Sequence, residues 1–125
     1  MKEIGIESSL AEAIRSGEKT IDCQLGKPDI LKLKVDDILS VREDIWEDGK
    51  KIGTHDYKLQ VKITQILFFE TINETMQSLD FMSIVPFAKS TNEATKIYSK
   101  FYSKDEELDF GIVAIFFDLI DDLHA

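Results

Sequence analysis

Residues 17–25 read GEKTIDCQL, and this stretch decides how the rest of the chain is interpreted. From Thr20 to Leu25 polar and apolar residues alternate strictly, which is typical of a strand with one face in the core and the other in water. Gly17 is a suitable C-terminal cap for a helix over residues 5–16. The sequence therefore predicts a helix that leads directly into a half-buried strand.

The remaining segments predict a mixed α+β domain. Three have strand patterns: residues 37–43, 57–64 and 111–120. Two have helix patterns: residues 69–79 and 91–102, the second behind a capping box that begins at Ser90. Residues 28–33 suit a short helical turn or a loop, and the acidic residues 105–109 and 118–122 suit solvated loop or tail. This order predicts one domain over residues 1–125, a small antiparallel or mixed barrel with helices at its side or end.

Composition excludes several classes of protein. With 125 residues, 43% hydrophobic and 31% charged, the chain is typical of one soluble globular domain. A net charge of −9 argues against binding duplex DNA or long RNA, which requires a basic surface. Because the N-terminal segment has no apolar stretch suited to a signal peptide, we expect a cytoplasmic protein with no membrane partner. The oligomeric state stays open.

Motifs for metal, redox or nucleotide chemistry are missing from the sequence. It contains no zinc-protease, nucleophile-elbow or phosphate-loop motif, so we expect no metal and no cofactor. The single cysteine, Cys23, cannot form an internal disulfide and is expected to be buried and inert. A histidine-based site would depend on His55 in a predicted hairpin loop, since His124 is next to last in the chain.

The polar residues of the quoted stretch are candidates for a binding site. Asp22 and Gln24 point to the same side of the predicted strand, and Lys19 lies where the chain leaves the helix. The three side chains either line one pocket or form a solvated face with an ordinary ion pair. In a pocket, burial would lower the pKa of Lys19 and suit it as a base or nucleophile, while Asp22 would raise that pKa.

Two more residues could contact a ligand. Arg42 lies at the end of the predicted strand over residues 37–43, and Trp46 lies in the loop after it. An exposed tryptophan beside an arginine suits stacking on a nucleobase. The alternative is that Trp46 folds back onto the core or the hairpin.

Residues 17–24 resemble the ASCH signature Gly-x-Lys-x-x-Glu-x-Arg, with Gly17, Lys19, Asp22 and Gln24 at its defined positions. Three further segments resemble the family in the right order: residues 31–43, 85–103 and 109–117. The resemblance implies a PUA-like pseudobarrel with three or so flanking helices, and a cleft between them that binds RNA or nucleoside-like ligands. Asp22 replaces the usual Glu, and Gln24 replaces the Arg that would meet a phosphate.

Three functions stay open at this point. The first is a module that binds a nucleobase, a nucleoside or short single-stranded RNA. The residues assigned to its ligand are Gly17, Lys19, Asp22, Gln24, Arg42 and Trp46. The second is a hydrolase for a modified nucleoside amide, because the resemblance extends to an acetylcytidine amidohydrolase whose catalytic lysine and threonine align with Lys19 and Asp22. The third is a protein-interaction domain with a vestigial cleft.

Overall fold

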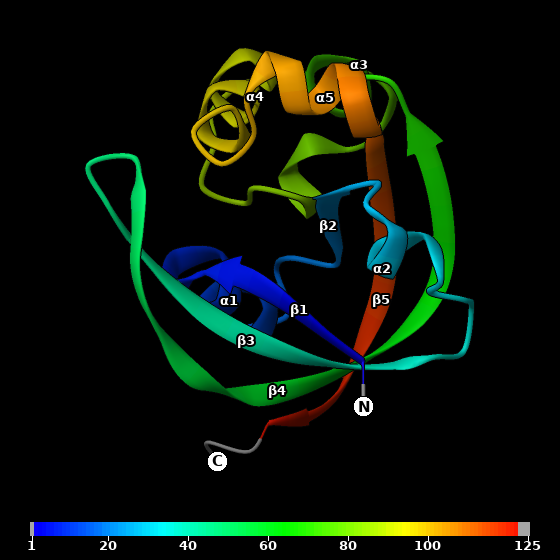
Figure 1. Cartoon of the computed structure of the whole chain (residues 1–125). Helices are drawn as coiled ribbons and strands as arrows, with labels where there is room; N and C mark the ends of the chain where they lie inside the picture. Colours follow the sequence, from blue (N-terminus) through cyan, green and yellow to red (C-terminus); the bar gives the residue numbers. More distant parts are fainter. Residues whose placement is uncertain (1, 123–125) are drawn as a thin grey trace.

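The computed structural model describes residues 2–122, apart from the side chains of residues 56–58, 121 and 122, so His124 lies outside the described part. Eleven elements follow one another along the chain (Figure 1). They are β1 (Lys2–Glu7), α1 (Ser8–Arg15), β2 (Ile21–Leu25), α2 (Pro28–Leu31), β3 (Ile38–Glu47), β4 (Lys50–Phe69), α3 (Ile72–Ser78), the 3₁₀ turn η1 (Phe81–Ser83), α4 (Thr91–Tyr98), α5 (Lys104–Phe110) and β5 (Ile112–Asp122).

The strands form one mixed sheet in the order β1-β3-β4-β5-β2. β1 runs parallel to β3, and every other pair is antiparallel. β4 is 20 residues long and pairs first with β3 and then with β5, so the sheet curls around it (Figure 1). The mixed α+β fold is confirmed, but the sheet is not a closed barrel, because its edge strands β1 and β2 share no backbone pairing in the described part of the chain.

The core lies inside this curl, where period-two patterns place apolar side chains. Leu59, Val61 and Ile63 on β4 are buried, as the alternation predicted, while the side chain of Tyr57 is outside the described part. Residues 112–115 of β5 are buried on both faces. Helix α1 adds its apolar face to the same cluster, and α3, α4 and α5 gather at one end of the curl (Figure 1).

The predicted helix over residues 5–16 was wrong at its beginning. Ile4 and Ile6 alternate with Gly5 as in a strand, and β1 pairs with β3 along its whole length. The helix begins only at Ser8, where the Glu7 carboxylate accepts hydrogen bonds from the first backbone N–H groups. A pairing partner more than thirty residues away decides this segment, and local pattern cannot reveal it.

The hairpin between β3 and β4 is much tighter than predicted. Asp48 and Gly49 both have positive φ, 52° and 75°, which is the geometry of a two-residue turn between antiparallel strands. β3 therefore continues to Glu47 and β4 starts at Lys50. Trp46 and His55, both expected in a loop, lie in strands.

Two acidic segments expected as loop or tail are also regular structure. Residues 104–110 form α5, started by a reciprocal capping box between Ser103 and Glu106, and Asp118 lies in β5. The predicted helices over residues 69–79 and 91–102 are present but shorter, as α3 and α4. The short helical turn predicted to start at Pro28 is confirmed as α2. The described residues form five α-helices where three or so were expected. Within residues 2–122 no helix is long and apolar enough to cross a membrane.

Candidate ligand-binding cleft

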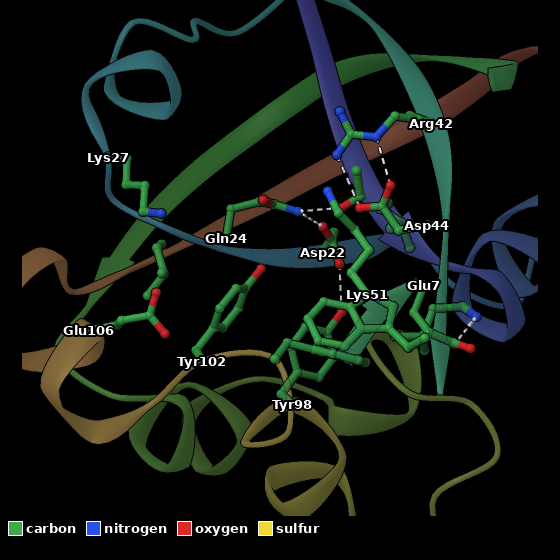
Figure 2. Close-up of a pocket in the computed structure, with 16 residues that line it drawn as sticks. Glu7, Asp22, Gln24, Lys27, Arg42, Asp44, Lys51, Tyr98, Tyr102 and Glu106 are labelled. Carbon is green, nitrogen blue, oxygen red and sulfur yellow. Dashed lines mark hydrogen bonds and ion pairs between the residues drawn. The ribbon is translucent and has the colours of Figure 1, made fainter. Parts of the chain in front are cut away.

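A cleft of about 330 Å³ opens where the two edges of the curled sheet face each other (Figure 2). Its floor is the polar face of β2, with Asp22 and Gln24. One wall is the strand β3, and the other is the C-terminal end of α4 and the residues that follow. The cleft thus lies between the sheet and the helices, where the resemblance implied a ligand site.

Lys19 lies beneath the floor of the cleft and does not line it. Its side chain is 0% exposed. The ammonium donates to the carbonyl oxygens of Ile21 and Ile84, at 2.6 and 2.7 Å, and to the Tyr98 hydroxyl at 2.7 Å. Asp22 Oδ1 is 3.2 Å from the same nitrogen. The expectation that Lys19 lies on the cleft floor is therefore wrong.

The hydrogen bonds assign charges to this buried group. Burial lowers the pKa of Lys19, and the neighbouring Asp22 carboxylate opposes that shift. Two of the three hydrogen-bond partners are carbonyl oxygens, which can only accept, and the Asp22 carboxylate lies 3.2 Å away, so these surroundings fit the ammonium form of the lysine. The Tyr98 hydroxyl accepts from Lys19 and donates to Asp22 Oδ1 at 2.5 Å, and burial raises the pKa of Tyr98 well above its ordinary value. We call the side chains of Lys19, Asp22 and Tyr98 the buried triad.

Asp22 and Gln24 share one face of β2, as predicted, but that face is covered and not solvated. Asp22 is 2% exposed. The Gln24 amide nitrogen donates to Asp22 Oδ2 at 2.6 Å and to the Gly5 carbonyl oxygen at 3.3 Å. Since Gly5 belongs to β1, the Gln24 side chain joins the two edges of the sheet across the floor.

Arg42 lines the cleft as a fixed ion pair. Its guanidinium donates two parallel hydrogen bonds to Asp44, at 2.7 and 3.0 Å, and a third to Glu3 at 3.1 Å. The bonds to Asp44 raise the pKa of Arg42 further. The pair lies directly over Gly5, where a Cβ atom would collide with both Arg42 and Asp44. A glycine at this position is therefore required for the observed geometry, a role that the sequence analysis missed.

Aromatic side chains form the walls of the cleft. Trp46 packs against Phe101 with ring centroids 5.0 Å apart, and Phe101 packs edge-on against Tyr98 at 5.6 Å. Tyr102 completes this wall, with its hydroxyl donating to the Cys23 carbonyl oxygen at 3.0 Å. Trp46 is partly buried, so it both packs on a neighbour and presents a ring to the cleft.

The tyrosines and Phe101 were missed as site residues. Helical spacing identified Tyr98 and Phe101 only as the apolar face of a helix. No local signal places them next to Asp22, because 76 residues separate Tyr98 from it in the sequence.

Charges around the cleft nearly cancel. The lining residues include three cations and four acids, and Lys19 beneath the floor is a fourth cation. The cations are Lys27, Arg42 and Lys51, and the acids are Glu7, Asp22, Asp44 and Glu106. The cleft is therefore close to neutral in a chain whose net charge is −9.

The other predicted residues lie away from the cleft. Gly17 ends the turn after α1 with a φ of 86° and does not line the cleft. His55 is exposed and pairs with Glu43 at 3.0 Å. Cys23 is fully buried, and burial raises the pKa of its thiol to about 12, so the predicted buried thiol is confirmed. Among residues 2–122 no group of three or more His, Cys, Asp or Glu side chains is placed to hold a metal ion.

A wider hollow of about 1,080 Å³ lies along α5, beside α3 and α4. Its lining includes Glu70, Leu108 and Phe110. None of the residues that line this hollow is fully buried. Size alone does not make a site, and the smaller cleft has the convergent polar and aromatic groups.

Comparison with solved structures finds the same fold over nearly the whole chain. Hypothetical protein PH0355 is 29% identical, with 96% of this chain and 100% of that chain covered and a TM-score of 0.78. Protein PF0455 from Pyrococcus furiosus is 24% identical, with 95% and 96% covered and a TM-score of 0.69. Protein EF3133 from Enterococcus faecalis V583, of the family DUF984, is 14% identical, with 93% and 69% covered and a TM-score of 0.60. The last two show the fold alone. No protein-family model and no curated protein matches the sequence.

The fold and the position of the cleft define the class of protein: an α+β domain built on a curled, open mixed sheet, the fold that this chain shares with hypothetical protein PH0355. The four segments that resemble the ASCH family follow one another along this fold in the expected order.

Proposed function

We propose that the cleft binds a neutral nucleobase or nucleoside, either free or in a short single-stranded RNA. One observation carries the proposal: the half-buried rings of Trp46, Phe101 and Tyr102 line the same cleft as the buried carboxylate of Asp22 and the amide of Gln24. Rings suit stacking on the face of a base, and polar groups suit its edge.

Size and charge support the same ligand class. A volume of about 330 Å³ lies within the range of about 300–1,000 Å³ that is usual for small-molecule sites. Four acids offset the three cations of the lining, so the cleft lacks the net positive charge that nucleic-acid backbones require. A flat, uncharged ligand with a hydrogen-bonding edge therefore fits better than a polyanion.

The geometry does not favour hydrolysis of a nucleoside amide. A lysine that acts as base or nucleophile needs a free lone pair and access to substrate. Lys19 has neither, because its side chain is fully buried and its three hydrogens are donated to three acceptors.

Calorimetric titration of the protein with the four common ribonucleosides and a short single-stranded RNA tests the proposal. We expect saturable binding of at least one nucleoside and none of duplex DNA at physiological salt. Trp46→Leu should weaken binding by about 1–3 kcal/mol through lost stacking. Phe68→Leu is the matched control, since Phe68 is 66% exposed on β4 and does not line the cleft.

Two results would contradict the proposal. The first is failure of every nucleoside and of the RNA to bind, which leaves the protein-interaction domain as the remaining hypothesis. The second is equal weakening by Trp46→Leu and Phe68→Leu, which would place the ligand outside the cleft.

A further inference from the structure

The Gln24 amide on the cleft floor uses its hydrogen-bond donors on other protein groups, so none is left for a ligand. Both hydrogens on the Gln24 amide nitrogen are used, one by Asp22 Oδ2 and one by the Gly5 carbonyl (Figure 2). Both partners can only accept, so the amide orientation is forced: a flipped amide would place oxygen against two acceptors. Gln24 therefore faces the ligand with its carbonyl oxygen, which has no partner among the described residues and is not a buried atom.

The two tyrosine hydroxyls are constrained in the same way. Tyr98 receives a hydrogen from Lys19, which can only donate, so its own hydrogen goes to Asp22. Tyr102 gives its hydrogen to the Cys23 carbonyl, and Figure 2 shows its oxygen pointing toward Gln24. Toward a ligand, Tyr102 can only accept.

The β2 floor and the adjoining Tyr102 hydroxyl thus offer hydrogen-bond acceptors and no donors, and the cations of the cleft, Lys27, Arg42 and Lys51, lie outside this floor. Three oxygens are available: Asp22 Oδ2, which has accepted one hydrogen bond and can accept another, Gln24 Oε1 and the Tyr102 hydroxyl oxygen. A ligand carbonyl placed against them would be an acceptor facing acceptors. A ligand N–H or NH₂ group would be satisfied.

We propose that this acceptor-only floor selects nucleobases that insert an exocyclic amino edge, which means guanine, cytosine or adenine in preference to uracil or hypoxanthine. This inference rests on the proposed function and specifies its ligand. Guanine presents two adjacent donors, N1–H and the N2 amino group, to Asp22 and Gln24. Uracil presents a single N–H between two carbonyls, and each of those carbonyls would meet a floor oxygen.

Calorimetry with two matched pairs of nucleosides tests the selection on the unmodified protein. Guanosine and inosine differ only in the N2 amino group, whereas cytidine has an N4 amino group and an N3 acceptor where uridine has the O4 carbonyl and an N3–H donor. We expect the amino-bearing member of each pair to bind about tenfold more tightly or better, the size of effect that one specific base contact produces. Equal or tighter binding of inosine and uridine would overturn the selection and leave the proposed function intact. If none of the four nucleosides binds, the proposed function fails and the selection with it.

A variant supplies an independent readout. Gln24→Met keeps a side chain of similar length and removes the floor carbonyl. Its discrimination within each pair should fall to a few-fold, with its fold checked by thermal unfolding. If the folded variant discriminates within each pair as strongly as the unmodified protein, Gln24 does not belong to the acceptor set. The test with the two nucleoside pairs on the unmodified protein is independent of this variant.

Discussion

Replacement of Tyr98 by phenylalanine measures how much the hydrogen bonds of the buried triad contribute to the free energy of unfolding. The substitution removes one hydroxyl that accepts from the Lys19 ammonium at 2.7 Å and donates to the Asp22 carboxylate at 2.5 Å, and leaves the aromatic ring. A hydrogen bond to a charged group contributes about 1.5–3 kcal/mol. Two such bonds are lost, but Lys19 and Asp22 remain 3.2 Å apart and attract each other more strongly once the hydroxyl is gone. We therefore expect the free energy of unfolding to fall by about 2–4 kcal/mol.

Tyr102→Phe is the matched control, because it removes the same group from a neighbouring ring. That hydroxyl makes one hydrogen bond, to the uncharged carbonyl of Cys23 at 3.0 Å, and its loss should cost about 0.5–1.5 kcal/mol. Urea unfolding of both variants gives the comparison, provided that the dependence on urea concentration has the same slope in each. If Tyr98→Phe is no more destabilising than Tyr102→Phe, the triad does not hold the charges assigned to it.

Three further expectations concern other parts of the site. Gly5→Ala should displace the Arg42–Asp44 pair, whose ends occupy the space of the new Cβ, and weaken nucleoside binding more than it lowers stability; calorimetry and urea unfolding of the same variant separate the two effects. Above pH 9.0 the unfolded thiol of Cys23 ionises while the buried thiol, with its pKa raised to about 12, stays protonated. The folded state then binds more protons, so stability should fall between these pH values by up to about 1.4 kcal/mol per unit, and Cys23→Ala should remove that part of the slope in urea unfolding. Gln24→Arg should shift preference from a nucleoside toward its monophosphate by about 1–3 kcal/mol, since a guanidinium adds a charged donor; equal relative affinities in both proteins, measured by titration, would show that position 24 does not face the ligand.

Local patterns predicted that β4 and β5 exist, but not the full length of β4, which was expected over residues 57–64 and runs from Lys50 to Phe69. Alternation gave the buried face of β4, and a continuous apolar run gave β5. β1 could not be found in this way, since its parallel partner β3 lies far along the chain and the short segment KEIGIE also fits the approach to a helix. The Asp48-Gly49 pair is a recognised signal for a two-residue hairpin, and its use would have placed Trp46 in a strand.

The candidate site was predictable only where one strand carries it. Asp22 and Gln24 are two residues apart, so strand geometry alone puts them on one face. Two of the partners of Lys19, Ile84 and Tyr98, lie 65 and 79 positions away in the sequence, and no local spacing pattern predicts those contacts. For that reason the sequence suggested a reactive lysine at the surface of a cleft. In the structure the Lys19 ammonium is buried, and protein oxygen atoms take the place of water around it.

The order of the strands in the sheet also determines when the cleft can form during synthesis of the chain. β2 is an edge strand whose sole partner in the described sheet is β5, and β5 begins at Ile112. A ribosome-bound chain that has emerged only as far as residue 97 has made the floor strand and Lys19 but neither the strand that holds them nor the Tyr98 hydroxyl. The cleft is therefore assembled only after β5 has left the ribosome, and fragments that end before β5 should expose Lys19 and Asp22 to solvent.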